Sequence, residues 1–190
     1  MSATLDATVP LSLGAATLGP QRIVCLTEET TEWLYLLGQE ARIVGISGYT
    51  VRPRRAREEK PKVSAFLSAK IDKILALEPD CVFGFSDLQA DIAAALIRHG
   101  VPVTVFNQRS VAEIFTMLYQ VAAMVGQAEK GLALLDRMRA SLQAIAAAAA
   151  RQPRGALQSM PVEARRCTLS TASDHAIIAS EVISKEASAA

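Results

Sequence analysis

The chain has 190 residues, of which 51% are hydrophobic and 21% are charged, and this composition is sufficient for at least one packed domain. Its formal net charge of +1 argues against a nucleic-acid partner, because phosphate binding needs a dense positive surface. No stretch reaches the roughly 18 continuous apolar residues of a membrane-spanning helix.

Residues 22–107 alternate short β-branched runs with helical stretches, and this spacing is typical of a parallel α/β sheet. The pattern predicts a three-layer, Rossmann-like lobe in which a parallel sheet lies between helices. The expected strands are residues 22–26, 42–46, 62–66, 81–85 and 101–106.

Capping residues and glycines set the expected helix boundaries. A helix from about Thr30 to Leu37 is expected to end at Gly38. Asp87 is expected to cap the helix that follows the fourth strand. Ser110 and Glu113 form a capping box that opens a further helix. The apolar stripe predicted for the helix after Asp87 consists of Ile92, Ala95, Leu96 and Ile97.

The remaining chain is expected to hold one long helix and two irregular ends. Residues 127–151 repeat apolar side chains at helical spacing and predict a connecting helix. Residues 152–190 show no sustained period and are expected to be irregular or disordered. The predicted parts are therefore a flexible segment 1–21, a lobe 22–126, a long helix 127–151 and a tail 152–190.

Polar and aromatic residues follow the ends of the predicted strands. In an open parallel sheet, ligands bind at the carboxyl ends of the strands. Tyr49, Phe66 and Phe85 all fall there and could form the floor of a cleft for a large, flat, apolar ligand held by stacking. The alternative is that they are three ordinary core aromatics. The full set of candidate ligand-binding residues is Tyr49, Phe66, Phe85, Ser86, Glu29 and Asn107.

Signatures of catalysis are few. No GxGxxG motif follows the first strand, and neither a P-loop nor a GxSxG elbow occurs. His99 is expected at a helix C-terminus and His175 in the tail, so neither indicates a catalytic metal. Glu28 and Glu29 could act as acid and base, but carboxylates also favour a helix N-terminus. We therefore expect no enzyme activity, no metal site and no cofactor.

The three cysteines lack the spacing of a metal site or a disulfide framework. Cys25 and Cys81 lie in apolar strand runs and are expected to be buried thiols, and Cys167 falls in the tail. The N-terminal residues have no basic start and carry Asp6, unlike a signal peptide, so the sequence as written predicts a cytoplasmic protein.

Four segments, in this order and spacing, resemble a known family: RIVCLTEETTEWLYLLG, RIVGISGYTVRPRRA, KVSAFLSAKIDKILALEPDCVFGF and VPVTVFNQRSVAEI. Residues 22–150 resemble the N-terminal lobe and connecting helix of the periplasmic cobalamin and iron-chelate binding proteins of ABC importers. The resemblance is strongest to the vitamin B12-binding branch. It implies non-covalent binding of cobalamin or a related corrinoid between two lobes.

The resemblance also implies roles for individual residues. Tyr49 and Phe66 match cleft aromatics that contact the corrin ring, and Phe85 is a third candidate. Asp72 matches an acidic residue through which the family's lobe docks onto an arginine of the membrane permease. The helix 127–151 resembles the rigid helix that joins the two lobes.

Two features depart from the family pattern. The family is normally exported to the periplasm, whereas no convincing signal peptide is found here. The family's second lobe should begin near Arg154, but the residues from Gln152 onward do not resemble it. A frameshift or truncation near Pro153 is one hypothesis for this change in composition.

Three other functions stay open from the sequence. An iron chelate or haem could bind on the same scaffold through Arg52 or Arg109. A small enzyme could act through Glu28, Glu29 or Asp87. A truncated interaction protein without a ligand could self-associate through the apolar stripe of the exposed helix 127–150.

Overall fold

A computed structural model of the chain describes residues 19–151. The predicted tail, Cys167, His175 and most of the predicted flexible N-terminal segment lie outside the described residues. The chain divides into two compact units with a boundary after Gly131, and each unit is described by itself. The domain boundaries expected from the sequence stay a prediction.

The first unit is built on a five-stranded sheet in which every neighbouring pair is parallel. The strand order is β3-β2-β1-β4-β5, so the chain reverses its direction of winding between β1 and β4. This confirms the predicted parallel α/β fold. The strands are β1 (Ile23–Cys25), β2 (Ile43–Ser47), β3 (Lys62–Ser64), β4 (Cys81–Phe85) and β5 (Val103–Phe106).

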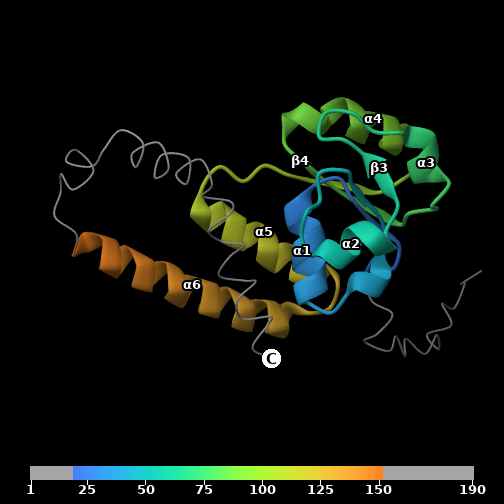
Figure 1. Cartoon of the computed structure of the whole chain (residues 1–190). Helices are drawn as coiled ribbons and strands as arrows, with labels where there is room; N and C mark the ends of the chain where they lie inside the picture. The colour runs from blue at the N-terminus through green and yellow to red at the C-terminus, as the bar shows by residue number, and fades with distance from the viewer. Residues whose placement is uncertain (1–18, 152–190) are drawn as a thin grey trace, which may run out of the picture. The chain divides into compact units, whose positions relative to one another are not determined.

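Helices cover both faces of the sheet. Figure 1 shows α3 and α4 over one face and α1, α2 and α5 over the other, which confirms the three predicted layers. The helices of the first unit are α1 (Glu28–Leu36), α2 (Arg54–Glu59), α3 (Ile71–Leu75), α4 (Ala90–Arg98) and α5 (Val111–Met124), with short 3₁₀ turns η2 (Glu40–Arg42) and η3 (Asp87–Gln89).

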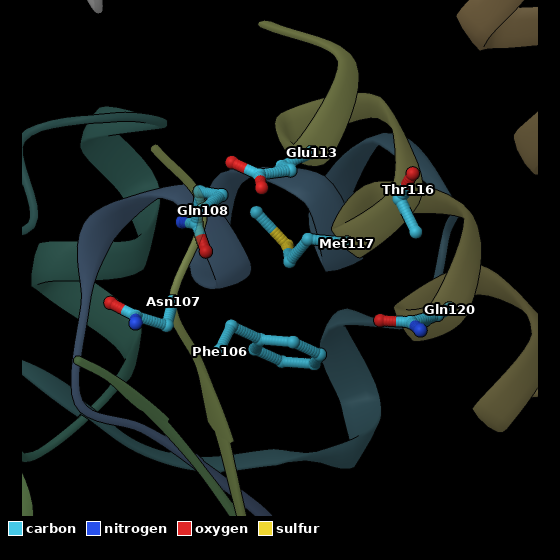
Figure 2. Close-up of a pocket in the computed structure, with 7 residues that line it drawn as sticks. All are labelled: Phe106, Asn107, Gln108, Glu113, Thr116, Met117 and Gln120. Atoms are coloured by element: carbon cyan, nitrogen blue, oxygen red, sulfur yellow. The ribbon is translucent and has the colours of Figure 1, made fainter. Parts of the chain in front are cut away.

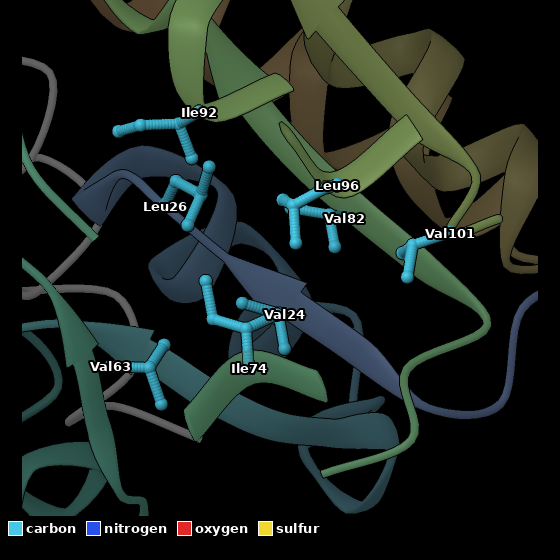
Figure 3. Close-up of a cluster of buried hydrophobic side chains, with 8 residues drawn as sticks. All are labelled: Val24, Leu26, Val63, Ile74, Val82, Ile92, Leu96 and Val101. Atoms are coloured by element: carbon cyan, nitrogen blue, oxygen red, sulfur yellow. The ribbon is translucent and has the colours of Figure 1, made fainter. Parts of the chain in front are cut away.

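Each face of the sheet buries its own apolar layer, because successive strand side chains point to opposite faces. On the α3–α4 side, Val24 and Val82 of the sheet belong to a buried cluster with Ile74 and Leu96 of the two helices, shown in Figure 3. On the other side, the buried Trp33 of α1 donates a hydrogen bond from Nε1 to the backbone oxygen of Leu118 in α5 (2.8 Å). This layer fixes α1 and α5 against each other.

Three local predictions were wrong. Helix α1 begins at Glu28 and not at Thr30. The Thr30 and Thr31 side chains are buried, and their hydroxyls donate to the Thr27 backbone oxygen, so both residues lie inside the helix. Ser86, and not Asp87, caps η3: its Oγ accepts the Leu88 N–H at 3.2 Å. In α4, Ile97 is exposed, and Ala93 is buried with Ile92 and Leu96.

Other boundaries agree with the sequence. Glu28 and Glu29 occupy the first turn of α1, and Gly38 and Gly126 follow their helices with the positive φ (both 72°) that favours glycine. Ser110 caps α5 by accepting the Glu113 N–H at 3.2 Å. Half of the predicted capping box is therefore confirmed.

The long helix α6 (Ala128–Ala150) was predicted at this position, and it starts in the first unit and continues into the second. In the second unit, Leu132 and Ile145 are exposed by 47% and 44%. Self-association through this helix stays a prediction. No helix within residues 19–151 combines the length and the apolar character needed to cross a membrane.

Candidate functional site at the carboxyl edge

The carboxyl ends of the five strands and the loops that follow them form one edge of the first unit, here called the carboxyl edge. It comprises residues 26–29, 47–50, 64–67, 85–89 and 106–109. Because all five strands are parallel, every predicted ligand-binding residue lies in these loops or at a strand end. The switch in winding between β1 and β4 falls in the middle of this edge, which is where ligands bind to open α/β sheets.

Aromatic side chains at the carboxyl edge are only partly covered. The rings of Phe66 and Phe85 pack with centroids 6.4 Å apart and planes tilted by 44°, and both side chains are half-buried. Tyr49 is 56% exposed. The neighbouring Leu67 and Leu88 are exposed as well, so the edge presents apolar surface to solvent. The alternative that Tyr49, Phe66 and Phe85 are ordinary core aromatics does not fit the exposed Tyr49. The buried aromatic pair of this sheet is Phe83 and Phe106.

Gln89 holds these loops together. This side chain is buried, its Oε1 accepts the Phe85 N–H (2.9 Å), and its Nε2 donates to the backbone oxygens of Phe66 (3.0 Å) and Leu26 (3.5 Å). It therefore connects the ends of β1 and β4 to the loop after β3, and it positions both rings of the Phe66–Phe85 pair. Nothing in the sequence marks Gln89, since its partners are as distant as 63 residues along the chain.

Glu29 lies half-buried behind this surface. Burial is the main reason why the pKa of its carboxyl is raised above the ordinary value. Its Oε1 accepts a long hydrogen bond from Gln108 Nε2 (3.5 Å). Glu29 thereby links the loop after β1 to the loop after β5, across the switch point.

The raised pKa of Glu29 predicts a pH-dependent stability. The folded chain disfavours the ionised form, so the stability that this group contributes is present at low pH and is lost as the pH rises from 4.5 through the folded-state pKa. We expect Glu29→Gln to raise the free energy of unfolding at pH 7 and to flatten its pH dependence in that window. Urea unfolding at several pH values measures both effects. A variant less stable than the wild type at pH 7 would contradict this account.

The two arginines proposed to hold an anionic ligand differ in their availability. Arg52 lies 3.4 Å from the Glu32 carboxylate, and both side chains are largely covered. Arg109 is exposed: its guanidinium lies over the Phe85 ring, 5.5 Å from the centroid, and 3.4 Å from Asp87. An exposed ion pair is weak, so Arg109 is the better candidate for binding an anion at the carboxyl edge.

A pocket of about 180 Å³ lies between the end of β5 and the start of α5, here called the β5–α5 pocket. In Figure 2, the Phe106 ring lies on one side of the pocket, and the Met117 side chain of α5 lies between Phe106 and Glu113. Pockets for drug-sized ligands typically measure about 300–1,000 Å³, so this one has room only for a small group. Its lining residues are Phe106, Asn107, Gln108, Glu113, Thr116, Met117 and Gln120.

The remaining predicted residues have distinct surroundings. Ser86 is buried, and its hydroxyl caps η3, so it shapes the loop that carries Phe85. Asn107 is exposed beside the β5–α5 pocket. Asp72 is exposed in the first turn of α3.

The cysteines and acidic residues show no reactive arrangement in the described part of the chain. Cys25 and Cys81 are buried free thiols, as predicted, and burial raises the pKa of Cys25 to about 12. Within residues 19–151, no group of three or more His, Cys, Asp or Glu side chains could hold a metal ion.

The first unit is an α/β lobe whose candidate ligand site lies at the switch point of a parallel sheet. Residues 23–162 match the model of the periplasmic binding protein family, and the chain belongs to this family. This confirms the family resemblance drawn from the sequence.

Several individual proteins are similar to this chain. A vitamin B12-binding protein of Vibrio campbellii is 28% identical over 67% of this chain and 46% of its own length. A periplasmic haem-binding protein structure from Pseudomonas aeruginosa is 26% identical, with a TM-score of 0.61 over 70% of this chain and 50% of its own. The vitamin B12-binding protein of Vibrio cholerae (24% identity, TM-score 0.55, 65% and 51% coverage) shares the fold.

The comparisons bear on three further predictions. The chain spans about half the length of the curated relatives it matches. The family and the relatives are binding proteins and not enzymes, in agreement with the prediction of no catalysis. The family is a periplasmic one, and nothing found supports the cytoplasmic location expected from the sequence.

Proposed function

We propose that this chain is the substrate-binding component of an ABC-type uptake system and binds cobalamin or a related corrinoid non-covalently at the carboxyl edge. One observation carries the proposal: Phe66 and Phe85 form a half-buried aromatic pair at the carboxyl edge, and the exposed Tyr49 follows β2 at the same edge. The similarity to vitamin B12-binding proteins supports the choice of ligand.

The chemistry of the surface fits a large ring system. Flat apolar ligands bind aromatic side chains through stacking and through the area removed from water, about 25 cal/mol per Å². The carboxyl edge of the described lobe can cover one face of such a ligand. We therefore expect the described lobe by itself to bind cyanocobalamin more weakly than a protein that covers both faces.

Phe66→Ala is the variant that tests the proposal. Removing the ring takes away stacking area, and we expect cyanocobalamin to bind roughly 10-fold more weakly. Tyr119→Ala is the matched control, because Tyr119 is 40% exposed on α5 outside the carboxyl edge. Calorimetric titration measures both, after thermal unfolding confirms that the variants are folded. Equal affinity of wild type and Phe66→Ala would refute the assignment of the site.

An iron chelate or haem is the second candidate, and Arg109 is the observation that favours it. Its exposed guanidinium beside the Phe85 ring could pair with a carboxylate of a stacked ligand. The similarity to a haem-binding protein agrees with this alternative. Competition between cyanocobalamin and haemin separates the two candidates: if haem is the ligand, haemin binds more tightly and Arg109→Gln weakens it.

Asp72 is the proposed contact to an ABC permease. Its exposed carboxylate at the start of α3 is available to an arginine of a partner. This role rests on the family resemblance and on that exposure.

A further inference from the structure

The described side chains that line the β5–α5 pocket can form hydrogen bonds, and none of them is positively charged. Asn107, Gln108 and Gln120 contribute primary amides to its lining, and Thr116 contributes a hydroxyl. No lysine, arginine or histidine belongs to the lining among the residues that the structure describes. Phe106 and Met117 supply the apolar walls (Figure 2).

The side-chain oxygen of Gln108 accepts no hydrogen bond from the described residues. Gln108 Nε2 donates a long hydrogen bond to Glu29 Oε1 (3.5 Å). The other end of the amide, Oε1, is buried and receives no hydrogen bond from any residue in the described part of the chain. A buried acceptor without a donor is unfavourable, so an N–H group of a ligand would stabilise this pocket.

Negative charge at the pocket disfavours an anionic ligand group. The Glu113 carboxylate accepts the Arg109 backbone N–H at 2.7 Å, and this hydrogen bond is the main reason why its pKa is lowered. Glu113 is therefore ionised at neutral pH. A ligand carboxylate would meet this charge and the Gln108 oxygen without a cation in the lining, whereas a neutral amide would offer N–H donors to both.

We propose that the β5–α5 pocket binds a primary carboxamide of the ligand and selects it over a carboxylate. The inference rests on the proposed function, because cobalamin carries peripheral propionamide arms whereas haem carries propionates. The pocket volume of about 180 Å³ suits one such arm while the ring system lies on the aromatic surface. Gln108 is then a residue that determines specificity between the two ligand classes.

A fragment titration tests the pocket without any corrinoid. Propionamide and propionate are added separately to the ¹⁵N-labelled chain at concentrations on the order of 10–100 mM, as suits a ligand of few atoms. We expect propionamide, and not propionate, to shift the side-chain amide signals of Gln108 and Gln120. Gln108→Leu should abolish the response, and Gln39→Leu, at the amino end of β2, should leave it unchanged. No shift, or equal shifts with both fragments, overturns the proposal.

A second titration connects the pocket to the ligand. Cyanocobalamin is compared with its monocarboxylic acids, in each of which one propionamide is hydrolysed. At least one acid should bind roughly 5- to 100-fold more weakly to the wild type, and Gln108→Leu should remove the difference. Equal binding of cyanocobalamin and all the acids overturns the pocket's role and leaves the proposed function intact. Selective propionamide binding by a chain that does not bind cyanocobalamin refutes the proposed function alone.

Discussion

Replacing Trp33 with alanine is expected to lower the free energy of unfolding by about 3–5 kcal/mol, the range for truncating a buried aromatic residue. Trp33 is 1% exposed, and its indole donates to the Leu118 oxygen, so the change opens a cavity between α1 and α5 and removes a hydrogen bond. Since whole domains are stable by about 5–15 kcal/mol, part of the population should unfold. Urea unfolding followed by far-ultraviolet circular dichroism measures the loss without relying on the single tryptophan.

Trp33→Phe separates packing from hydrogen bonding. It keeps an aromatic ring but loses the donor to Leu118, and we expect a smaller loss of about 1–2 kcal/mol. If Trp33→Ala were no less stable than Trp33→Phe, the α1–α5 layer would not be the packed layer described above.

Gln89→Leu is expected to lower the free energy of unfolding by about 2–4 kcal/mol, because it leaves the Phe85 N–H and the Phe66 oxygen without their buried partner. The same change should loosen the Phe66–Phe85 pair and weaken cyanocobalamin binding more than the stability loss alone explains. Urea unfolding and calorimetric titration of the folded variant measure the two effects.

Two comparisons show whether Gln89 acts through these hydrogen bonds. Gln39→Leu is the matched control. Gln39 is the N-cap residue of η2, and its side chain makes no cap hydrogen bond there. Gln89→Glu keeps the acceptor for the Phe85 N–H but turns a buried carboxylate oxygen toward the Phe66 oxygen, so we expect it to be no more stable than Gln89→Leu at neutral pH. A Gln89→Leu variant as stable as Gln39→Leu would show that the three hydrogen bonds do not support the carboxyl edge.

The strands and their parallel arrangement could be predicted from the sequence, because each is a short apolar run followed by a polar cluster. Local hydrogen bonding displaced some boundaries. Thr30 and Thr31 are good capping residues by type, yet their hydroxyls return to the Thr27 oxygen inside α1. At η3 the cap is Ser86 and not Asp87, because the Ser86 hydroxyl accepts the Leu88 N–H. Ser86 also has a positive φ of 55°, which the sequence does not indicate.

The candidate site was predictable only in part. The sequence predicted the position of Tyr49, Phe66 and Phe85 at the carboxyl edge, because each follows or ends a recognisable strand. Gln89 and Gln108 could not be found, since their importance depends on partners 63 and 79 residues away along the chain. Ligand contact by the predicted residues stays a prediction.

Titration of the ¹⁵N-labelled chain with cyanocobalamin shows directly whether the ligand binds at the carboxyl edge. We expect saturable shifts concentrated in the loops of this edge, at residues 47–50, 64–67, 85–89 and 106–109, with the amino ends of the strands unchanged. Shifts confined to the amino ends of the strands, or no shifts in a folded chain at millimolar cyanocobalamin, would contradict binding at this edge.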